Sequence, residues 1–133
     1  MSTVVLDASA ALQLVLRLDD PRPLVELLRS ASTVVAPRLF AVETANALWK
    51  YVRAGHLTES EAIEALRAAL SLVTYPIDDA DMAIEALSTA ARYQHPAYDA
   101  MYATLARRLG GAVATRDRRL RDLLAVLRID AIP

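Results

Sequence analysis

The sequence predicts an α/β fold, a three-layer α/β/α sandwich around a mainly parallel sheet of four to five strands. Two observations carry this prediction. Short apolar runs alternate with longer segments of helix formers along all 133 residues, a pattern typical of parallel strands joined by helical crossovers. The apolar runs are also continuous, as expected of strands that are buried on both faces. Because the chain shows no internal repeat or linker, we expect one domain over residues 1–133.

The first half of the chain predicts two strands and four helices. The strands are residues 3–6 and 33–35, and the helices are residues 8–16, 24–31, 39–53 and about 59–72. Pro21 and Pro23 are expected to interrupt the chain before the second helix begins. Gly55 is expected to end the third helix, and Thr58 with Glu61 has the spacing of a capping box for the fourth.

The second half predicts up to three strands and three helices. The strands are a weak one at 73–77, one at 112–115 and a possible fifth at 128–132. The helices run from Asp79 or Asp81 to 93, from 98 to 109, where Gly110-Gly111 ends the helix, and from 117 to 127. Pro76 weakens the signal for the strand at 73–77, because proline cannot donate to a sheet ladder. Asp78, Asp79 and Asp81 together are expected to mark the start of a helix, and the alternative for three acids so close is a surface cation site.

Composition excludes several classes of protein. There is no cysteine, which excludes disulfides and thiolate metal sites, and the only histidines are His56 and His95, too few for the usual catalytic zinc site. The longest stretch without a charged residue has ten residues, about half of what spans a bilayer. We therefore expect a soluble, cytoplasmic protein without a membrane segment, and the high apolar content favours a buried interface with a partner.

Four acidic residues are predicted to converge on one site. Asp7 and Asp117 directly follow the first and fourth predicted strands, while Glu43 and Asp99 lie on otherwise apolar helical segments. Ligands in open α/β sheets bind beyond the carboxyl ends of the strands, so the two strand-end acids meet if those strands are neighbours. Converging carboxylates repel one another, and a divalent cation relieves the repulsion. The pattern indicates a Mg²⁺- or Mn²⁺-dependent enzyme that acts on phosphate esters.

Three of the four acids also have a simpler structural interpretation. Asp7 and Asp117 are good helix N-caps, and Asp99 falls in a first helical turn, where negative charge is favoured. The two interpretations are compatible, because a helix N-terminus also keeps a carboxylate ionised and ready to bind a cation.

Glu43 lies in mid-helix, where capping cannot apply. One interpretation places it in a solvent-facing stripe with Asn46, Lys50 and Arg53, which follow at spacings of three to four residues. The other makes Glu43 and Asn46 point together into a cleft, because residues three apart share a helix face.

Other side chains are weaker candidates for a functional role. His95 precedes a proline and is interpreted as a turn residue. Trp49, Phe40 and the tyrosines are interpreted as packing residues. Asp122 is a possible substitute for Asp117.

Four segments together resemble the motifs of the PIN-domain ribonucleases, in particular the VapC toxins of VapBC toxin–antitoxin systems. The segments are VVLDASA at 4–10, PRLFAVETANAL at 37–48, YDAMYATLA at 98–106 and ATRDRRL at 114–120. Each is a weak signal alone. All four occur in order, with their acids separated by 36, 56 and 18 residues, and this makes the joint signal strong.

The resemblance implies a metal-dependent endoribonuclease. It implies that Mg²⁺ or Mn²⁺ is held by the four acids, that Ser9 and Thr115 support the carboxylates by hydrogen bonding, and that Asn46 lines the cleft. Attack by a metal-bound water would leave a 5′-phosphate and a 3′-hydroxyl. The four acids are Asp7, Glu43, Asp99 and Asp117. Arg116, Arg118 and Arg119 surround Asp117 in the sequence, and from this location we expect them to contact backbone phosphates.

The resemblance also implies a homodimer and a VapB-like antitoxin whose C-terminal segment covers the cleft. The apolar segments 12–28 and 40–51 are candidate groove walls for this partner, and the alternative interpretation makes them ordinary core faces. Two alternatives stay open: a PIN-fold module that binds RNA or protein without turnover, and a PIN nuclease that is not a toxin. A receiver domain does not fit, because the only lysine is Lys50, in mid-helix. A haloacid-dehalogenase-type phosphatase needs Asp-x-Asp, whereas Ser9 stands at the second position after Asp7 here.

Overall fold

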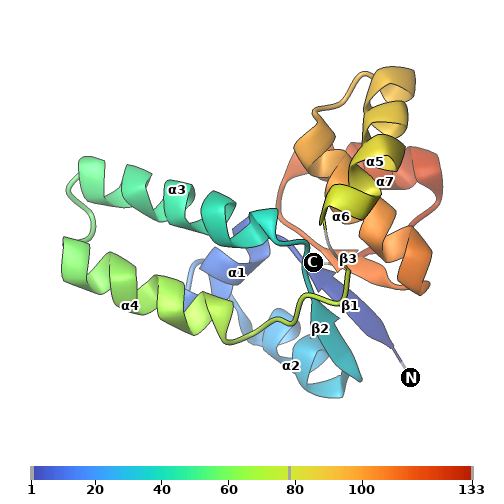
Figure 1. Ribbon diagram of the computed structural model, residues 1–133. Helices are drawn as coiled ribbons and strands as arrows, with labels where there is room; N and C mark the ends of the chain where they lie inside the picture. Colours follow the sequence, from blue (N-terminus) through green and yellow to red (C-terminus); the bar gives the residue numbers. More distant parts are fainter. Residues whose placement is uncertain (1, 78, 133) are drawn as a thin grey trace.

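The computed structural model describes residues 2–77 and 79–132. Within these ranges the chain forms four strands and seven helices (Figure 1). In order they are β1 (Thr3–Leu6), α1 (Ala8–Val15), α2 (Arg22–Ser30), β2 (Thr33–Val35), α3 (Leu39–Arg53), α4 (Glu59–Leu70), α5 (Asp79–Tyr93), α6 (Ala97–Leu109), β3 (Ala112–Ala114), α7 (Arg118–Leu127) and β4 (Ala131–Ile132).

The sheet is parallel and has the strand order β2-β1-β3-β4. In the register, Val4 of β1 pairs with Val34 of β2 on one side and with Ala112 of β3 on the other. The chain runs from β1 outward to β2 and returns to the opposite side of β1 as β3. The switch point of the sheet therefore lies between β1 and β3. This confirms the predicted α/β class and makes the strands before Asp7 and Asp117 neighbours.

The predicted strand at 73–77 is wrong. Within the described residues, this segment contributes one isolated bridge, between Val35 and Thr74, with the Thr74 N–H donating to the Val34 carbonyl at 3.0 Å. Pro76 has no N–H group, which prevents the ladder from continuing. The expected last strand forms, but only as the short β4.

Alternation along the central strand divides the core into two layers. Val4 and Leu6 of β1 pack with residues of α1, α2, α3 and α4, whereas Val5 packs with residues of α5, α6 and α7. Successive side chains of a strand point to opposite faces, so the strand is covered by helices on both sides. The three-layer α/β/α arrangement is confirmed, and Figure 1 shows the two groups of helices on either side of the sheet.

Local capping fixes several helix starts where the sequence predicts them. Thr58 and Glu61 form the predicted capping box at the start of α4. Asp7 and Asp117 are the N-caps of α1 and α7, respectively, and accept hydrogen bonds from backbone N–H groups in the first turn. Asp79 begins α5, while the neighbouring position 78 of the predicted acidic helix start lies outside the described residues.

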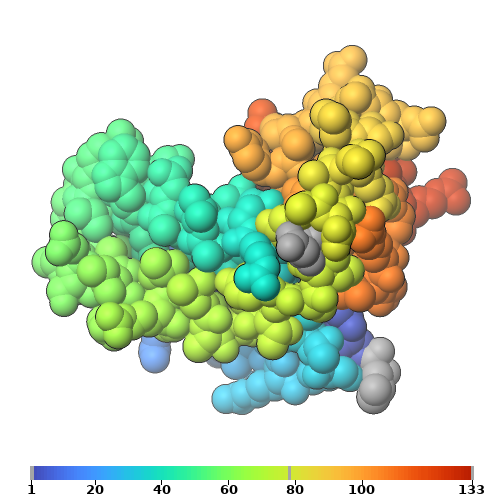
Figure 2. All heavy atoms as spheres, viewed as in Figure 1, coloured from blue at the N-terminus to red at the C-terminus, as the bar shows by residue number. Residues whose placement is uncertain are grey.

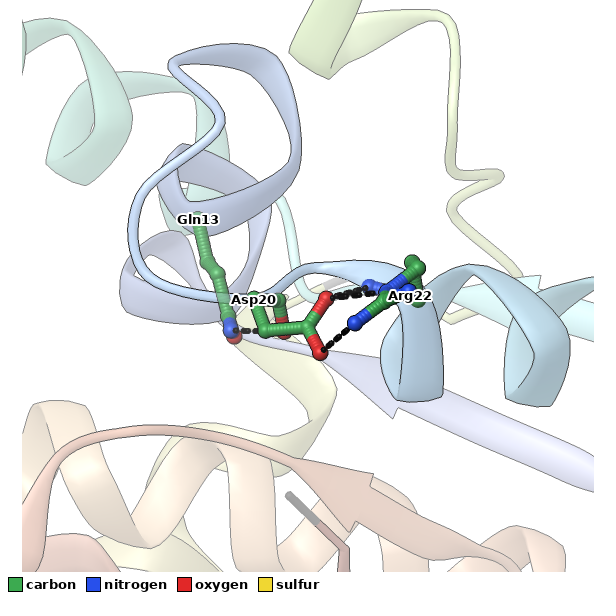
Figure 3. A network of polar contacts seen from close by, with 3 residues as sticks. All are labelled: Gln13, Asp20 and Arg22. Atoms are coloured by element: carbon green, nitrogen blue, oxygen red, sulfur yellow. Dashed lines mark hydrogen bonds and ion pairs between the residues drawn. The ribbon is translucent and has the colours of Figure 1, made fainter.

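Helix α2 begins at Arg22, two residues before the predicted start. Pro23 occupies its first turn, where proline is tolerated because its missing N–H has no helical partner. Figure 3 shows the preceding turn: Arg22 donates to the Asp20 carboxylate through its side chain at 2.8 and 2.9 Å and through its backbone N–H at 3.1 Å. The Gln13 side chain also donates to the Asp20 carbonyl at 3.3 Å, which ties the turn to α1.

The α3–α4 hairpin extends away from the sheet, and α5, α6 and α7 lie on the opposite side (Figure 1). In the space-filling view, a notch separates this hairpin from the α5–α6–α7 helices (Figure 2). Among the described residues, no helix is both long enough and apolar enough to cross a membrane.

Candidate active site

A cleft of about 350 Å³ opens at the carboxyl ends of β1 and β3. All four predicted acids line it, each from a different element: Asp7 after β1, Glu43 on α3, Asp99 on α6 and Asp117 before α7. The switch point of the sheet thus gathers side chains that are far apart in sequence. The remaining lining residues are Ala8, Ser9, Leu12, Asn46, Ala47, Lys50, Tyr102 and Leu120.

Asp7 is buried at the base of the cleft, with 5% of its surface exposed. Its Oδ1 accepts hydrogen bonds from the Ser9 hydroxyl at 2.8 Å and the Ala10 N–H at 2.9 Å, and its Oδ2 accepts one from the Thr115 hydroxyl. Burial raises the pKa of Asp7 to about 6, although these three hydrogen bonds oppose the increase and the nearby Asp117 adds to it.

Ser9 and Thr115 join the loops that follow β1 and β3. Both hydroxyls donate to Asp7, and the two oxygens lie 3.4 Å apart. Ser9 also accepts from the Arg116 N–H of the other loop at 2.8 Å, while Thr115 accepts from the Asp117 N–H of its own loop at 2.9 Å. The arrangement orients the Asp7 carboxylate from both strand ends.

Glu43 is half-buried and faces the cleft. Its Oε1 accepts a hydrogen bond of 2.6 Å from the hydroxyl of Tyr102 on α6. Burial raises the pKa of Glu43, the Tyr102 hydrogen bond opposes this, and the negative charges of the other three acids raise it further.

The polar stripe of α3 divides between the cleft and the solvent. Asn46 and Lys50 continue from Glu43 along the cleft lining. Arg53 leaves the cleft, and its guanidinium lies 4.5 Å from the centre of the Trp49 ring. The interpretation of Glu43 and Asn46 as residues that share a cleft-facing side of the helix agrees with this geometry.

Asp99 presents an oxygen that the protein does not satisfy. Its Oδ2 is buried and has no hydrogen-bond partner among the described residues. Burial and the charge of Asp117 raise the pKa of Asp99, while Arg119 and His95 oppose the increase. A buried carboxylate oxygen without a donor is costly, so this atom is a natural place for a cation.

Asp117 is the most exposed of the four acids. Its Oδ1 caps α7 by accepting from the Arg119 N–H at 2.9 Å and the Leu120 N–H at 3.3 Å. The capping interpretation and the cleft interpretation therefore both describe this residue. Asp122, considered as a substitute, is exposed and is not part of the cleft lining.

The donor set fits Mg²⁺ or Mn²⁺, which prefer carboxylate oxygen. Among the described residues, however, no three acidic side chains lie in the arrangement of a ready-made metal site. Both oxygens of Asp7 and one oxygen each of Glu43 and Asp117 accept hydrogen bonds from the protein. Burial is the main cause of the raised pKa values of Asp7, Glu43 and Asp99, and the charges of neighbouring acids raise each of them further.

The three arginines expected at RNA have different surroundings. The Arg116 guanidinium forms an ion pair with Asp19 in the α1–α2 connection. Arg118 and Arg119 are exposed at the start of α7 and form no ion pair with any residue that the structure describes.

Two side chains of the cleft were not predicted from the sequence to have a role there. Tyr102 was interpreted as packing; it is buried, but its hydroxyl also holds Glu43. Its spacing of three residues from Asp99 on one helix was the signal that could have revealed it. Lys50, the single lysine, was assigned only to the solvent-facing stripe and lines the cleft.

The packing interpretation of the aromatic residues holds for some of them and fails for others. Phe40 and Tyr102 are buried, which confirms the interpretation. Trp49 and Tyr98 have 51% and 65% of their surface exposed, so these two do not belong to the core.

Comparison with known proteins gives one family. The PIN domain family profile matches residues 4–124. Ribonuclease VapC3 of Pyrobaculum aerophilum is 32% identical over 130 residues, which cover 93% of this chain and 96% of that protein.

Solved structures are similar over nearly the whole chain. The crystal structure of PAE2754 from Pyrobaculum aerophilum superposes with a TM-score of 0.75 at 27% identity, over 92% of this chain and 86% of that chain. VapBC-1 from nontypeable Haemophilus influenzae gives 0.66 at 13% identity, and FitAcB from Neisseria gonorrhoeae gives 0.60 at 17%. Both cover 98% of this chain and 96% of the other. At these two identities the likeness concerns the fold alone.

Proposed function

Because the chain belongs to the PIN domain family, we propose that it is a metal-dependent endoribonuclease that hydrolyses RNA phosphodiester bonds. We further propose that it is the toxin of a toxin–antitoxin pair and that residues 1–133 form one PIN domain. The observation that carries the proposal is the cleft at the switch point, lined by Asp7, Glu43, Asp99 and Asp117. The similarity to a protein named Ribonuclease VapC3 supports the nuclease assignment.

The residues of the cleft have different proposed roles. The four acids would hold the cation. When bound, Mg²⁺ or Mn²⁺ lowers the pKa of a water ligand and neutralises charge that develops on the phosphate. Ser9 and Thr115 orient Asp7, and Tyr102 orients Glu43.

The cleft rim offers cations for the RNA backbone. Lys50 lines the cleft, and Arg118 and Arg119 are exposed at the start of α7. Phosphate contacts position a nucleic acid without reading its sequence. Arg116 would have to exchange Asp19 for a phosphate in order to contribute.

Two grooves, the second of them largely apolar, support a protein partner such as a VapB-like antitoxin. One lies between α1 and α4 and the other between α3 and α4, and the predicted groove walls at 12–28 and 40–51 contribute to them. The second groove includes Trp49 and Ile63, which are large apolar side chains with exposed surface. Contiguous exposed apolar surface of this kind is typical of interfaces.

We also propose that the chain forms a homodimer, in which the exposed face of α5 takes part. Ile84 and Leu87 lie one helical turn apart on this helix and are both exposed, so they form one apolar surface.

Light scattering on the purified protein should give about twice the 14.5 kDa of one chain. Ile84→Asp should shift the mass toward that of one chain, whereas Asp122→Asn, at an exposed position of α7, should leave it unchanged.

RNA cleavage by the purified protein tests the enzymatic proposal. We expect cleavage of total cellular RNA with Mg²⁺ or Mn²⁺, none in EDTA, and 5′-phosphate ends. Glu43→Gln removes a carboxylate charge at nearly constant shape and should lower the rate by at least about 100-fold. Asp122→Asn is the matched control, because Asp122 is an exposed acid outside the cleft, and its rate should not change.

Three results separate the alternatives. Cleavage that persists in EDTA and in Glu43→Gln would come from another site or a contaminant. RNA binding without cleavage would identify a module without turnover. Cleavage in vitro without growth arrest on expression in bacteria would identify a PIN nuclease that is not a toxin.

A further inference from the structure

Helix α3 carries Glu43 but begins without a capping side chain from its own segment. Its N-cap residue is Arg38, whose side chain makes no capping hydrogen bond and lies instead 5.6 Å from the centre of the Tyr75 ring. The first N–H groups of a helix have no helical partner and need acceptors from elsewhere. Helix α3 therefore depends on a distant residue for this role.

Asp79, the first residue of α5, supplies acceptors for two N–H groups at the start of α3. Its Oδ1 accepts from the Arg38 N–H at 2.7 Å, and its Oδ2 accepts from the Leu39 N–H at 2.8 Å, although the residues are 41 and 40 positions apart in sequence. A carboxylate acceptor at the positive end of a helix makes such bonds stronger than neutral ones. Asp79 is thus a cap that acts between helices.

The bonds from Asp79 join the two sides of the acidic cleft. Helix α3 packs on α1 and α4, whereas Asp99 and Tyr102 lie on α6, which packs on α5. Glu43 follows Leu39 by four residues, about one helical turn. Two connections therefore run from the α5–α6 pair to this turn of α3: Asp79 binds its start, and the Tyr102 hydroxyl binds Glu43 itself at 2.6 Å.

We propose that Asp79 is a positioning residue of the active site, which holds Glu43 near Asp7 and Asp99 by capping α3 from α5. The proposal rests on the proposed function, since the position of Glu43 affects catalysis only if the cleft binds a cation. Asp79 itself does not line the cleft. It acts through the placement of α3.

Titration of the purified protein with MnCl₂ alone, followed by calorimetry, tests the proposal without relying on turnover. Asp79→Ala should weaken Mn²⁺ binding by about tenfold, as outer-shell substitutions at metal sites do. Asp79→Glu keeps a carboxylate that can reach the same N–H groups and should recover most of the affinity. Asp81→Ala is the matched control: it removes an exposed acid two residues away on α5, and its Mn²⁺ affinity should equal that of the unaltered chain.

A double-mutant cycle distinguishes positioning from general destabilisation. If Asp79 acts through Glu43, then Asp79→Ala should weaken Mn²⁺ binding much less in a Glu43→Gln background than in the unaltered chain. Amide hydrogen exchange should also accelerate at the start of α3 in Asp79→Ala and stay unchanged in Asp81→Ala. The RNA-cleavage kcat should fall with the Mn²⁺ affinity, measured at a temperature where every variant is folded.

Two outcomes would overturn the proposal. One is unchanged Mn²⁺ affinity and kcat in Asp79→Ala, even if its melting temperature falls, because Asp79 would then be merely structural. The other is that Asp79→Ala weakens Mn²⁺ binding equally in the unaltered chain and in the Glu43→Gln background. If the unaltered chain neither binds Mn²⁺ nor cleaves RNA, the proposed function fails and this positioning role fails with it; exchange data that still show a local cap at α3 would identify the function as the point of failure.

Discussion

Among single residues, Asp7 shows most clearly how the site opposes the stability of the fold. Its pKa in the folded chain is about 6, above the ordinary value of 3.8. Between these values the native state binds more protons than the unfolded state, so the free energy of unfolding falls as pH rises through this window. The loss at neutral pH is about 3 kcal/mol in the absence of a cation. Glu43 and Asp99 have raised pKa values too and act with the same sign.

Asp7→Asn should therefore stabilise the metal-free protein while abolishing RNA cleavage. At pH 7.5 in EDTA we expect the melting temperature to rise by about 10 °C, because a buried charge is removed. Near pH 4, where the folded protein already holds Asp7 protonated, the two proteins should melt at nearly equal temperatures. A lower melting temperature of the variant at pH 7.5 would show that the carboxylate stabilises the fold, contrary to its raised pKa.

Tyr102→Phe isolates the hydrogen bond to Glu43. The ring is buried and can stay in place, so we expect a stability change within about 1.5 kcal/mol and a fall in cleavage rate of about tenfold. Tyr98→Phe is the control, since Tyr98 is 65% exposed and its hydroxyl should not matter. Equal rates for both variants would show that Glu43 does not need this donor.

The sequence predicts side chains of the cleft where a local pattern marks them. Asp7 and Asp117 follow strands, and the Glu43–Asn46 spacing marks a helix face; the structure brings the predicted acids to one cleft. Tyr102 and Asp79 act through partners 59 and 41 residues away. No local pattern specifies such partners, because they depend on how the helices pack.

At the scale of elements, hydrophobic period and helix-ending residues predicted the helices and the strands β1, β2 and β3. Caps decide several helix starts locally, as at Thr58. The errors fall where tertiary structure decides: the segment at 73–77 reaches the sheet as a single bridge. The order β2-β1-β3-β4 was not predictable in full either, because it follows from how the crossovers pack.

Gly111 tests the close approach of the chain before β3 to β1. A Cβ added there would lie 2.6 Å from the carbonyl oxygen of Thr3, so Gly111→Ala must push the two strands apart. We expect a loss of about 1–3 kcal/mol of unfolding free energy in urea, the usual cost of overpacking. Gly55→Ala is the comparison: Gly55 has φ +81° but open space around it, and its loss should be about 1 kcal/mol. A larger loss at Gly55 than at Gly111 would contradict the tight strand contact.

For the whole molecule, cation binding should offset the repulsion within the cleft. At about 100 times its dissociation constant, Mn²⁺ should stabilise the native state by about 2.7 kcal/mol at pH 7.5. The stabilisation should decline as pH falls below about 6, where Asp7 takes up a proton. The difference in melting temperature with and without MnCl₂ measures this stabilisation. If MnCl₂ raises the melting temperature as much at pH 4.5 as at pH 7.5, the ion binds elsewhere.

The convergence of four carboxylates on one cation is tested most directly by a crystal structure with Mn²⁺ and its anomalous scattering. We predict a peak in the cleft that Asp7, Glu43, Asp99 and Asp117 line, close to carboxylate oxygens, and a peak that is lost or much reduced in Glu43→Gln. Absence of a peak at Mn²⁺ concentrations that support cleavage, or a peak only at exposed acids such as Asp81 or Asp122, would contradict the assignment of the site.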